Sequence, residues 1–185
     1  EKSLGAYFVI KGLVKMFQIN PDGREQILFF FSEDEAFGYR PLLSNTTHSF
    51  SATCTEDTEI KFIDADAFLK LVDTSAMFAK NLLKSLSYEF AVFGKRMNIY
   101  AQKGIKERLA FALLLLNEKY KTKKSKSEIS NIVLSRTDLA AFVGTSVDVI
   151  TRNLNYYIDN KLVRVNGKSI FILEIAKLYQ NIEMY

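Results

Sequence analysis

Residues 135–154 read SRTDLAAFVGTSVDVITRNL, and this stretch decides the fold of the C-terminal part of the chain. Its first serine, with an aspartate three residues later, is typical of a capped helix start in which Asp replaces the usual Glu or Gln. Gly144 can adopt the left-handed conformation that ends a helix and turns the chain. Thr145 or Ser146 can then cap a second helix. The stretch therefore predicts two short helices joined by a tight turn, a helix-turn-helix.

The second helix has one apolar and one polar face. Val149, Ile150 and Leu154 share the apolar face, which we expect to be buried. In a helix-turn-helix, the N-terminal residues of the second helix enter the major groove of DNA. There the Arg152 guanidinium can donate two hydrogen bonds to guanine, to O6 and N7, and the Asp148 carboxylate can accept one from a cytosine amino group. The residues expected to read bases are Val147, Asp148, Thr151 and Arg152.

Two β-prone runs, 161–165 and 169–172, flank an Asn-Gly turn and predict a two-stranded wing after the second helix. Polar and basic side chains around the motif suit contacts to phosphates, which fix register without reading sequence. The residues expected to make these contacts are Arg136, Ser146, Asn155 and Lys168. The lysine-rich segment 121–127 is either a solvated connection or a further phosphate contact.

The first seventy residues are predicted to form a β domain. Short apolar runs at 7–10, 13–19 and 26–31 predict strands, and the Asn-Pro-Asp-Gly segment at 20–23 predicts the turn of a hairpin. Further strands are expected at Ser49 to Thr55 and Glu59 to Ile63. This opening is typical of a β-sandwich or barrel.

A long helix is predicted from about Ser75, after a short helix at 65–72. Its apolar residues are spaced alternately four and three apart, which is the repeat of a coiled coil. The residues of this predicted dimer seam are Leu86, Phe90, Phe93, Met97 and Tyr100. The alternative is packing against the β domain of the same chain, but a helix of about 40 Å extends beyond a small barrel. Residues 102–104 are the expected hinge, and Ile105 to Tyr120 the next helix.

The charge is divided unevenly along the 185 residues. Residues 1–103 contain 12 basic and 13 acidic side chains, whereas residues 104–185 contain 13 basic and 8 acidic ones. A basic C-terminal half favours a polyanionic partner for that half alone. The longest apolar run is too short to span a bilayer, so no membrane association is expected. One cysteine, Cys54, and one histidine, His48, predict no disulfide and no metal site.

In order along the chain, these residues resemble the Crp/Fnr family of bacterial transcription regulators. The matching segments are Gly12-Leu13-Val14-Lys15, the turn ending at Gly23, Phe37-Gly38, Ser51-Ala52-Thr53, Glu107-Arg108-Leu109-Ala110, Leu134 to Ala140 and Gly144 to Leu154. The resemblance implies an α+β fold with an N-terminal β-roll that is jelly-roll-like and cupin-like, a long dimerisation helix and a winged helix-turn-helix. The expected domains are 1–74 for the cyclic-nucleotide-binding-like effector β-roll, 75–103 for the dimerisation helix and hinge, and 104–185 for the DNA-binding domain.

The family pattern has more β-roll sequence before Tyr7, so we expect the chain to be shortened at its N-terminus. The second helix of the motif is similar to the Fnr-type pattern Val-Glu-Thr-Ile-Ser-Arg and reads VDVITR at 147–152. The resemblance implies that Asp148, Thr151 and Arg152 read bases. Asp148 is one methylene shorter than the glutamate of that pattern.

The predicted effector pocket departs from the cyclic-AMP-binding members of the family. These have a glutamate after Phe-Gly and an arginine before the Ser/Thr-Ala pair, whereas here Tyr39 follows Gly38 and Phe50 precedes Ser51. Arg40 lies nearby and can supply a positive charge from another direction. We therefore expect an effector other than cyclic AMP. The residues expected to line the pocket are Gly38, Tyr39, Arg40, Ser49, Ser51 and Ala52.

The leading hypothesis is a cytoplasmic homodimeric regulator that binds a palindromic operator in double-stranded DNA and, by resemblance, RNA polymerase. The alternative is a β-roll that binds a ligand or a protein and has a vestigial DNA-binding half. The chain offers no catalytic residues, because it has no nucleophile–His–acid set and no Gly-rich phosphate loop. No cofactor is expected, since Cys54 alone cannot hold an iron–sulfur cluster. A haem bound through His48 has no further support in the sequence.

Overall fold

The computed structural model describes residues 1–121 and 130–183. Most of the lysine-rich segment predicted at 121–127 lies outside the described residues. The strands are β1 (Gly5–Lys11), β2 (Val14–Ile19), β3 (Glu25–Phe31), β4 (Ala36–Phe37), β5 (Ser51–Cys54), β6 (Glu59–Asp64), β7 (Asn131–Val133), β8 (Val163–Asn166) and β9 (Ser169–Ile172). The helices are α1 (Arg40–Ser44), α2 (Ala65–Thr74), α3 (Ala76–Gln102), α4 (Ile105–Tyr120), α5 (Arg136–Val143), α6 (Val147–Asp159) and α7 (Ile175–Glu183).

The chain forms two compact units. The first contains Glu1–Met16 and Phe31–Lys95, and the second contains Phe17–Phe30 and Arg96–Tyr185. The second unit therefore includes the outer part of the β2–β3 hairpin and the end of α3. Arg96 of α3 joins these two segments by donating to the carbonyl oxygens of Ile27 and Leu28. The domain boundaries drawn from the sequence, after residues 74 and 103, stay predictions.

Short antiparallel strands build the first unit. β1 lies between β4 and β6, and Gly5 pairs with Asp64 while Tyr7 pairs with Phe37. The sheet of order β3-β2-β5 contains the β2–β3 hairpin, whose outer part belongs to the second unit. The hairpin turn predicted at 20–23 is present, and Gly23 takes a φ of 78° there. This β-rich arrangement confirms the predicted fold class.

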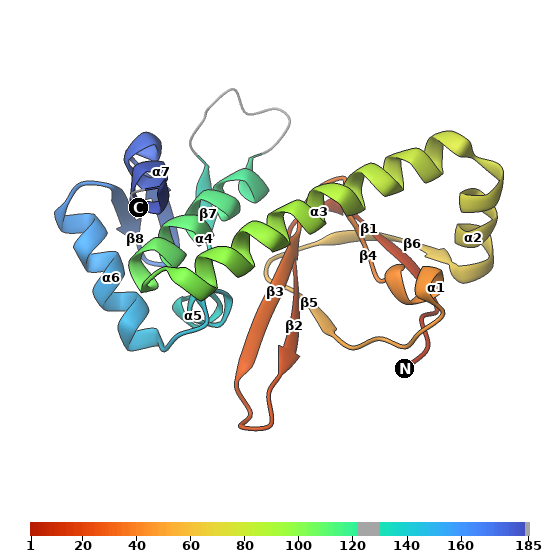
Figure 1. Ribbon diagram of the computed structural model, residues 1–185, viewed down its shortest axis with the longest axis horizontal. Helices are drawn as coiled ribbons and strands as arrows, with labels where there is room; N and C mark the ends of the chain where they lie inside the picture. Colours follow the sequence, from red (N-terminus) through yellow and green to blue (C-terminus); the bar gives the residue numbers. More distant parts are fainter. Residues whose placement is uncertain (122–129, 184–185) are drawn as a thin grey trace. The chain divides into compact units, whose positions relative to one another are not determined.

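Helices α2 and α3 follow the strands of the first unit (Figure 1). The Asp64 side chain caps α2 by accepting from the Ala67 amide at 3.0 Å. Phe68 on α2 is fully buried against Ala6 and Tyr39, and Leu86 on α3 packs against this cluster. α3 then continues as one uninterrupted helix of 27 residues.

The second unit has α4 at its centre. Every residue of this helix from Leu109 to Asn117 is buried except Leu115, so the helix is surrounded on all sides over this stretch. A small sheet of order β7-β9-β8 accompanies the helices, and β8 and β9 form the predicted wing. The first wing strand starts at Val163 and not at Lys161 as predicted, because Lys161 adopts a left-handed φ of 56° that no strand residue has. α5 and α6 follow one another across a tight turn (Figure 1).

Candidate functional site

The helix-turn-helix is built by local signals that the sequence contains. The Ser135 hydroxyl oxygen accepts from the Asp138 amide at 2.9 Å and donates to the Asp138 carboxylate at 2.5 Å, which confirms the predicted cap of α5. Gly144 ends α5 with a left-handed φ of 75°. Of the two candidate caps of α6, Ser146 takes the role, accepting from the Val149 amide at 3.4 Å. The turn therefore fixes where α6 starts.

Helix α6 has one buried and one exposed face. Ile150, Leu154 and Tyr157 are buried in the second unit. All the residues predicted to read bases are exposed, and so is the predicted phosphate contact next to them: these are Val147, Asp148, Thr151, Arg152 and Asn155. The Thr151 hydroxyl donates to the Val147 carbonyl oxygen at 2.8 Å. Arg152 forms no salt bridge with any residue that the structure describes.

Arg136 joins the start of α5 to the wing. Its Nη2 donates to the Gly167 carbonyl oxygen at 3.2 Å, in the turn between β8 and β9. Its Nη1 is buried and has no hydrogen-bond partner among the described residues. Burial lowers the pKa of this guanidinium from its ordinary value. Arg136 as a whole is partly exposed, and Lys168, which follows Gly167 in the wing turn, is exposed, so two cations near the start of α5 and in the wing turn suit contacts to phosphates.

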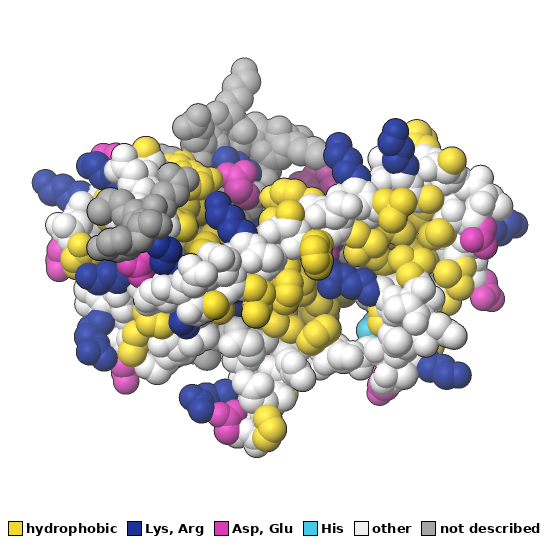
Figure 2. All heavy atoms as spheres, viewed as in Figure 1, with side chains coloured by type: hydrophobic (Ala, Val, Ile, Leu, Met, Phe, Trp, Pro, Cys, Tyr) yellow, Lys and Arg dark blue, Asp and Glu magenta, His cyan; other side chains and the backbone are white. Residues whose placement is uncertain are grey.

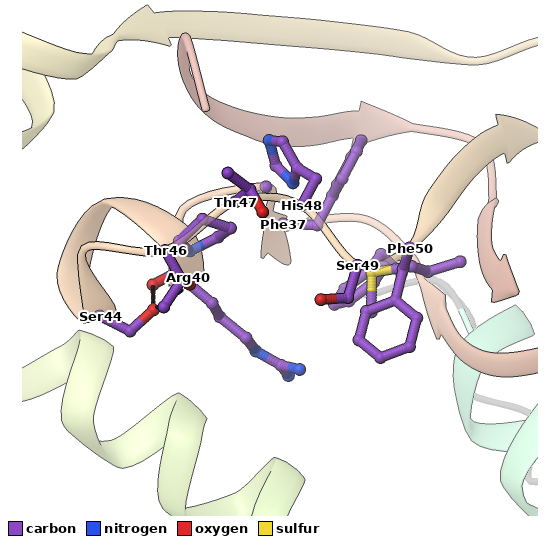
Figure 3. Close-up of a pocket in the computed structure, with 12 residues that line it drawn as sticks. Phe37, Arg40, Ser44, Thr46, Thr47, His48, Ser49 and Phe50 are labelled. Atoms are coloured by element: carbon purple, nitrogen blue, oxygen red, sulfur yellow. Dashed lines mark hydrogen bonds between the residues drawn. The ribbon is translucent and has the colours of Figure 1, made fainter. Parts of the chain in front are cut away.

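The first unit contains a pocket of about 140 Å³ (Figure 3). Arg40 extends from α1 into this pocket, and the Ser49 hydroxyl points toward the same space. Hydroxyl groups and one imidazole supply the other polar atoms. None of the lining residues is acidic: they are Met16, Phe31, Phe37, Gly38, Arg40, Pro41, Ser44, Thr46, Thr47, His48, Ser49 and Phe50. This lining suits an anionic ligand.

Three of the predicted pocket residues, Gly38, Arg40 and Ser49, line this space together. Ser51 and Ala52 lie on β5, where both are exposed, and are not part of the lining. Ser44, Thr46, Thr47 and His48 also line the pocket and are not among the residues predicted for it from the sequence. The signal that could have indicated them is the cluster of polar residues at 44–49, which begins at the last residue of α1.

Tyr39 lies outside the pocket lining and is 1 % exposed, stacked on Phe68 with ring centroids 5.6 Å apart. Burial raises the pKa of its hydroxyl, which has no hydrogen-bond partner among the described residues. Arg40 forms an ion pair with Glu89 of α3. Glu89 also accepts from the Ser85 hydroxyl at 3.4 Å. The pocket arginine is thus bonded to the long helix within the first unit.

Hydrophobic side chains lie at the surface along α3 (Figure 2). Of the predicted seam, Phe90 is 77 % exposed and Met97 is 53 % exposed, and Phe93 is also exposed. Leu86 instead packs partly buried against the cluster around Phe68. The Tyr100 hydroxyl donates to the Phe142 carbonyl oxygen at 2.5 Å within the second unit. The middle of the predicted seam is therefore exposed, whereas its two ends have contacts within the chain.

The described residues hold no group of three or more His, Cys, Asp or Glu side chains that could bind a metal ion. Cys54, the one cysteine of the chain, is exposed. In the part of the chain that the structure describes, no helix is both long enough and apolar enough to cross a membrane.

Comparison with known families gives two matches. Residues 1–75 match the family described as "Cyclic nucleotide-binding domain", and residues 107–180 match the "Crp-like helix-turn-helix domain". The two matches fall on the parts of the chain that contain the pocket and the helix-turn-helix.

Related proteins are similar to this chain over most of their length. The "Transcriptional activator protein anr" of Pseudomonas aeruginosa is 24 % identical over 94 % of this chain and 71 % of its own. The "Cyclic AMP receptor protein" of Thermus thermophilus is 27 % identical over 93 % of this chain and 76 % of its own. The structure of FixK2 from Bradyrhizobium japonicum has the same fold, with a TM-score of 0.84 at 21 % identity, over 97 % of this chain and 88 % of that one.

A β-rich ligand-binding domain, a long helix and a winged helix-turn-helix together define a class of DNA-binding transcription regulators, which are not enzymes. Within that class, the chain belongs to the Crp/Fnr family. The family resemblance noted in the sequence is thereby confirmed, and the Crp-like helix-turn-helix implies DNA binding.

Proposed function

We propose that this protein is a homodimeric, sequence-specific transcription regulator in which α6 reads bases in the major groove. One observation supports this most directly: the N-terminal half of α6 exposes Val147, Asp148, Thr151 and Arg152, while its other face is buried. A capped helix with polar side chains at its free N-terminal half is the element that enters a major groove. The basic excess of residues 104–185 adds the attraction to phosphates.

The proposed target is a palindrome in double-stranded DNA. Two copies of the chain joined along α3 present two α6 helices, which reach half-sites about 34–36 Å apart on one face of the duplex. Arg136 and Lys168 then contact phosphates at the edges of each half-site, together with Ser146 and Asn155. RNA polymerase is the further proposed partner, and the cytoplasm, where such DNA lies, is the proposed location.

We propose further that the β-roll responds to a small anion other than cyclic AMP, bound at Arg40. The Thermus relative is named for cyclic AMP, but here Tyr39 and Phe50 occupy the positions where cyclic-AMP-binding members have a glutamate and an arginine. The pocket has one guanidinium, several hydroxyls and no carboxylate in its lining. An anion bound there competes with Glu89 for Arg40 and so acts on α3.

Selection of bound duplexes from a random pool tests the DNA-binding proposal. The expected result is a palindrome of two half-sites, bound by the parent with a steep salt dependence. Arg152→Ala is expected to weaken binding by about tenfold to a hundredfold and to relax the preference at one base position. Lys177→Ala on α7, which removes an exposed cation, is the matched control. Weak, sequence-independent binding by the parent would favour the vestigial alternative instead.

Thermal-shift measurements with phosphate-bearing and carboxylate-bearing metabolites, cyclic AMP among them, test the effector proposal. At least one anion is expected to raise the melting temperature of the parent protein and to have no such effect on Arg40→Met. Cyclic AMP is expected to leave both melting temperatures unchanged. A stabilising effect of cyclic AMP that survives in Arg40→Met would contradict the proposed site.

A further inference from the structure

Arg96 is a buried cation with an unusual set of partners. It belongs to α3 and is only 5 % exposed, and no salt bridge with an acidic side chain is found for it in the described part of the chain. Its Nη1 donates to the Leu28 carbonyl oxygen at 2.6 Å. Its Nη2 donates to the carbonyl oxygens of Ile27 at 2.9 Å and Phe142 at 2.6 Å. A guanidinium can serve several carbonyls at once because its donors have a fixed planar geometry.

The partner carbonyls come from two different elements of the second unit. Ile27 and Leu28 belong to β3, whereas Phe142 is in the last turn of α5. The Arg96 guanidinium carbon also lies 4.3 Å from the centre of the Phe142 ring and 4.8 Å from that of Tyr100. Hydrogen bonds and ring contacts therefore hold the same three elements, α3, β3 and α5, around one side chain.

The last turn of α5 receives two more donors from outside the helix-turn-helix. The Tyr100 hydroxyl donates to the same Phe142 carbonyl, and the Gln26 amide nitrogen donates to the Ala141 carbonyl at 2.7 Å. The final carbonyls of a helix have no partner within the helix and carry partial negative charge. These carbonyl oxygens therefore take the place of a carboxylate as the partners of the buried Arg96 guanidinium, and the bonds hold the end of α5 against α3.

The position of this anchor along the chain matters for DNA recognition. Gly144 follows α5 directly, and α6 starts at Val147, so the end of α5 determines where the recognition helix begins. The Gly144 amide and the Thr145 amide both donate to the Ala140 carbonyl, which leaves little freedom between the two helices. Whatever holds the end of α5 on α3 thus also holds α6 on α3.

We propose that Arg96 is a positioning residue for DNA recognition, which sets the distance and angle between the two recognition helices of the dimer by anchoring α5 to α3 and β3. The inference rests on the proposed function, because it needs α3 to join two chains and α6 to read DNA. Arg96 itself touches no base in this arrangement. Replacing Arg96 should weaken the protein's preference for one spacing of the two half-sites. The bases that it prefers within each half-site should stay the same.

The test compares duplexes that have the selected half-sites at their preferred spacing and one or two base pairs further apart. Each added base pair moves a half-site by about 3.4 Å and rotates it around the duplex. The parent is expected to lose at least about tenfold in affinity on the altered spacings, the size expected when a charge-assisted contact is lost. Arg96→Met is expected to lose less than about threefold on the same duplexes. Arg96→Lys should be intermediate, because a lysine keeps the charge but not the planar fork.

Lys95→Met, which removes the neighbouring exposed cation of α3, is the matched control and should keep the spacing preference of the parent. If Arg96→Met does not fold, as judged by circular dichroism, the double variant Gln26→Met, Tyr100→Phe takes its place. A substitution that only destabilises the fold lowers binding equally at all spacings. Equal lowering, or an unchanged spacing preference in the folded variants, would overturn the inference. A parent that selects no palindrome would refute the proposed function instead.

Discussion

At the scale of single residues, Arg136 is the proposed phosphate contact that can be tested most directly. Its Nη2 is bonded to the Gly167 carbonyl, while its Nη1 is buried without a partner among the described residues. The side chain as a whole is partly exposed, so its positive charge can attract a phosphate of the DNA backbone. Arg136→Met is therefore expected to weaken binding to every duplex alike and to reduce the salt slope by about one unit. Titrations at several salt concentrations measure this slope, and an unchanged slope would rule out the phosphate contact.

A second residue-scale prediction concerns Tyr157, whose hydroxyl donates to the Lys106 carbonyl oxygen at 2.7 Å. Burial raises the pKa of Tyr157 well above its ordinary value of 10.0. Above about pH 10 the unfolded chain loses this proton and the folded chain keeps it, so the free energy of unfolding falls by about 1.4 kcal/mol per pH unit. Tyr100, whose pKa is also raised by burial, contributes in the same direction.

Tyr157→Phe separates this effect from the hydrogen bond. At pH 7 the variant is expected to be less stable than the parent by about 1 kcal/mol, since the bond to Lys106 is lost. Between pH 10 and pH 12 the difference should shrink, because the variant has no proton to lose at this position. Urea denaturation across this pH range measures both stabilities, and parallel curves would contradict the prediction.

At the scale of elements, replacing glycine by alanine is expected to have opposite effects on stability at two positions. Gly144 has a φ of 75°, so Gly144→Ala forces an L side chain into the left-handed region and should cost about 1–2 kcal/mol. Gly94 lies within α3, and a Cβ there would meet no atom within 4 Å. Gly94→Ala should therefore stabilise the protein by about 0.5–1 kcal/mol. Denaturation of the two variants at equal protein concentration measures the change in the free energy of unfolding of each. Changes of the same sign would show that the backbone conformation of the glycine does not determine the effect of the substitution.

Elements with local signals could be predicted from the sequence, and elements without them could not. The caps at Ser135 and Ser146 and the turn at Gly144 act within a few residues, so the sequence alone predicts the helix-turn-helix. The short elements β4 and α1, of 2 and 5 residues, have no period that a pattern could reveal. The pocket around Arg40 depends on contacts between distant segments. For the same reason, nothing local indicated that Glu89 would pair with Arg40.

At the scale of the whole molecule, the apolar repeat of α3 could not distinguish partners within the chain from a second copy of it. The spacing placed Leu86 and Tyr100 in the same series as Phe90 and Met97. In the structure Leu86 packs on the Phe68 cluster and Tyr100 bonds to Phe142, whereas Phe90 and Met97 are exposed. A repeat of four and three shows that one face is apolar, but only the fold determines what covers each position.

The exposed part of that face leads to the last prediction, that a charge at Phe90 separates the dimer. Phe90 is 77 % exposed in the single chain, so Phe90→Asp should leave the fold of each chain intact. Burying a carboxylate in an apolar interface without a partner costs several kcal/mol, enough to shift the protein to monomers at micromolar concentration. Sedimentation measures the mass, and affinity for the palindrome should fall because a monomer contacts one half-site only.

Tyr88→Asp is the matched control, since Tyr88 is 63 % exposed on the same helix and lies two positions away, on the side opposite Phe90. The same charge on that side should leave the dimer and its affinity for DNA unchanged. If both variants stay dimeric, the interface does not lie on α3. If both become monomeric, the helix is disturbed in general and the Phe90 face has no special role. Only the loss of the dimer in Phe90→Asp alone agrees with a pair of chains joined along this face, which is the arrangement that two half-sites on one side of a duplex require.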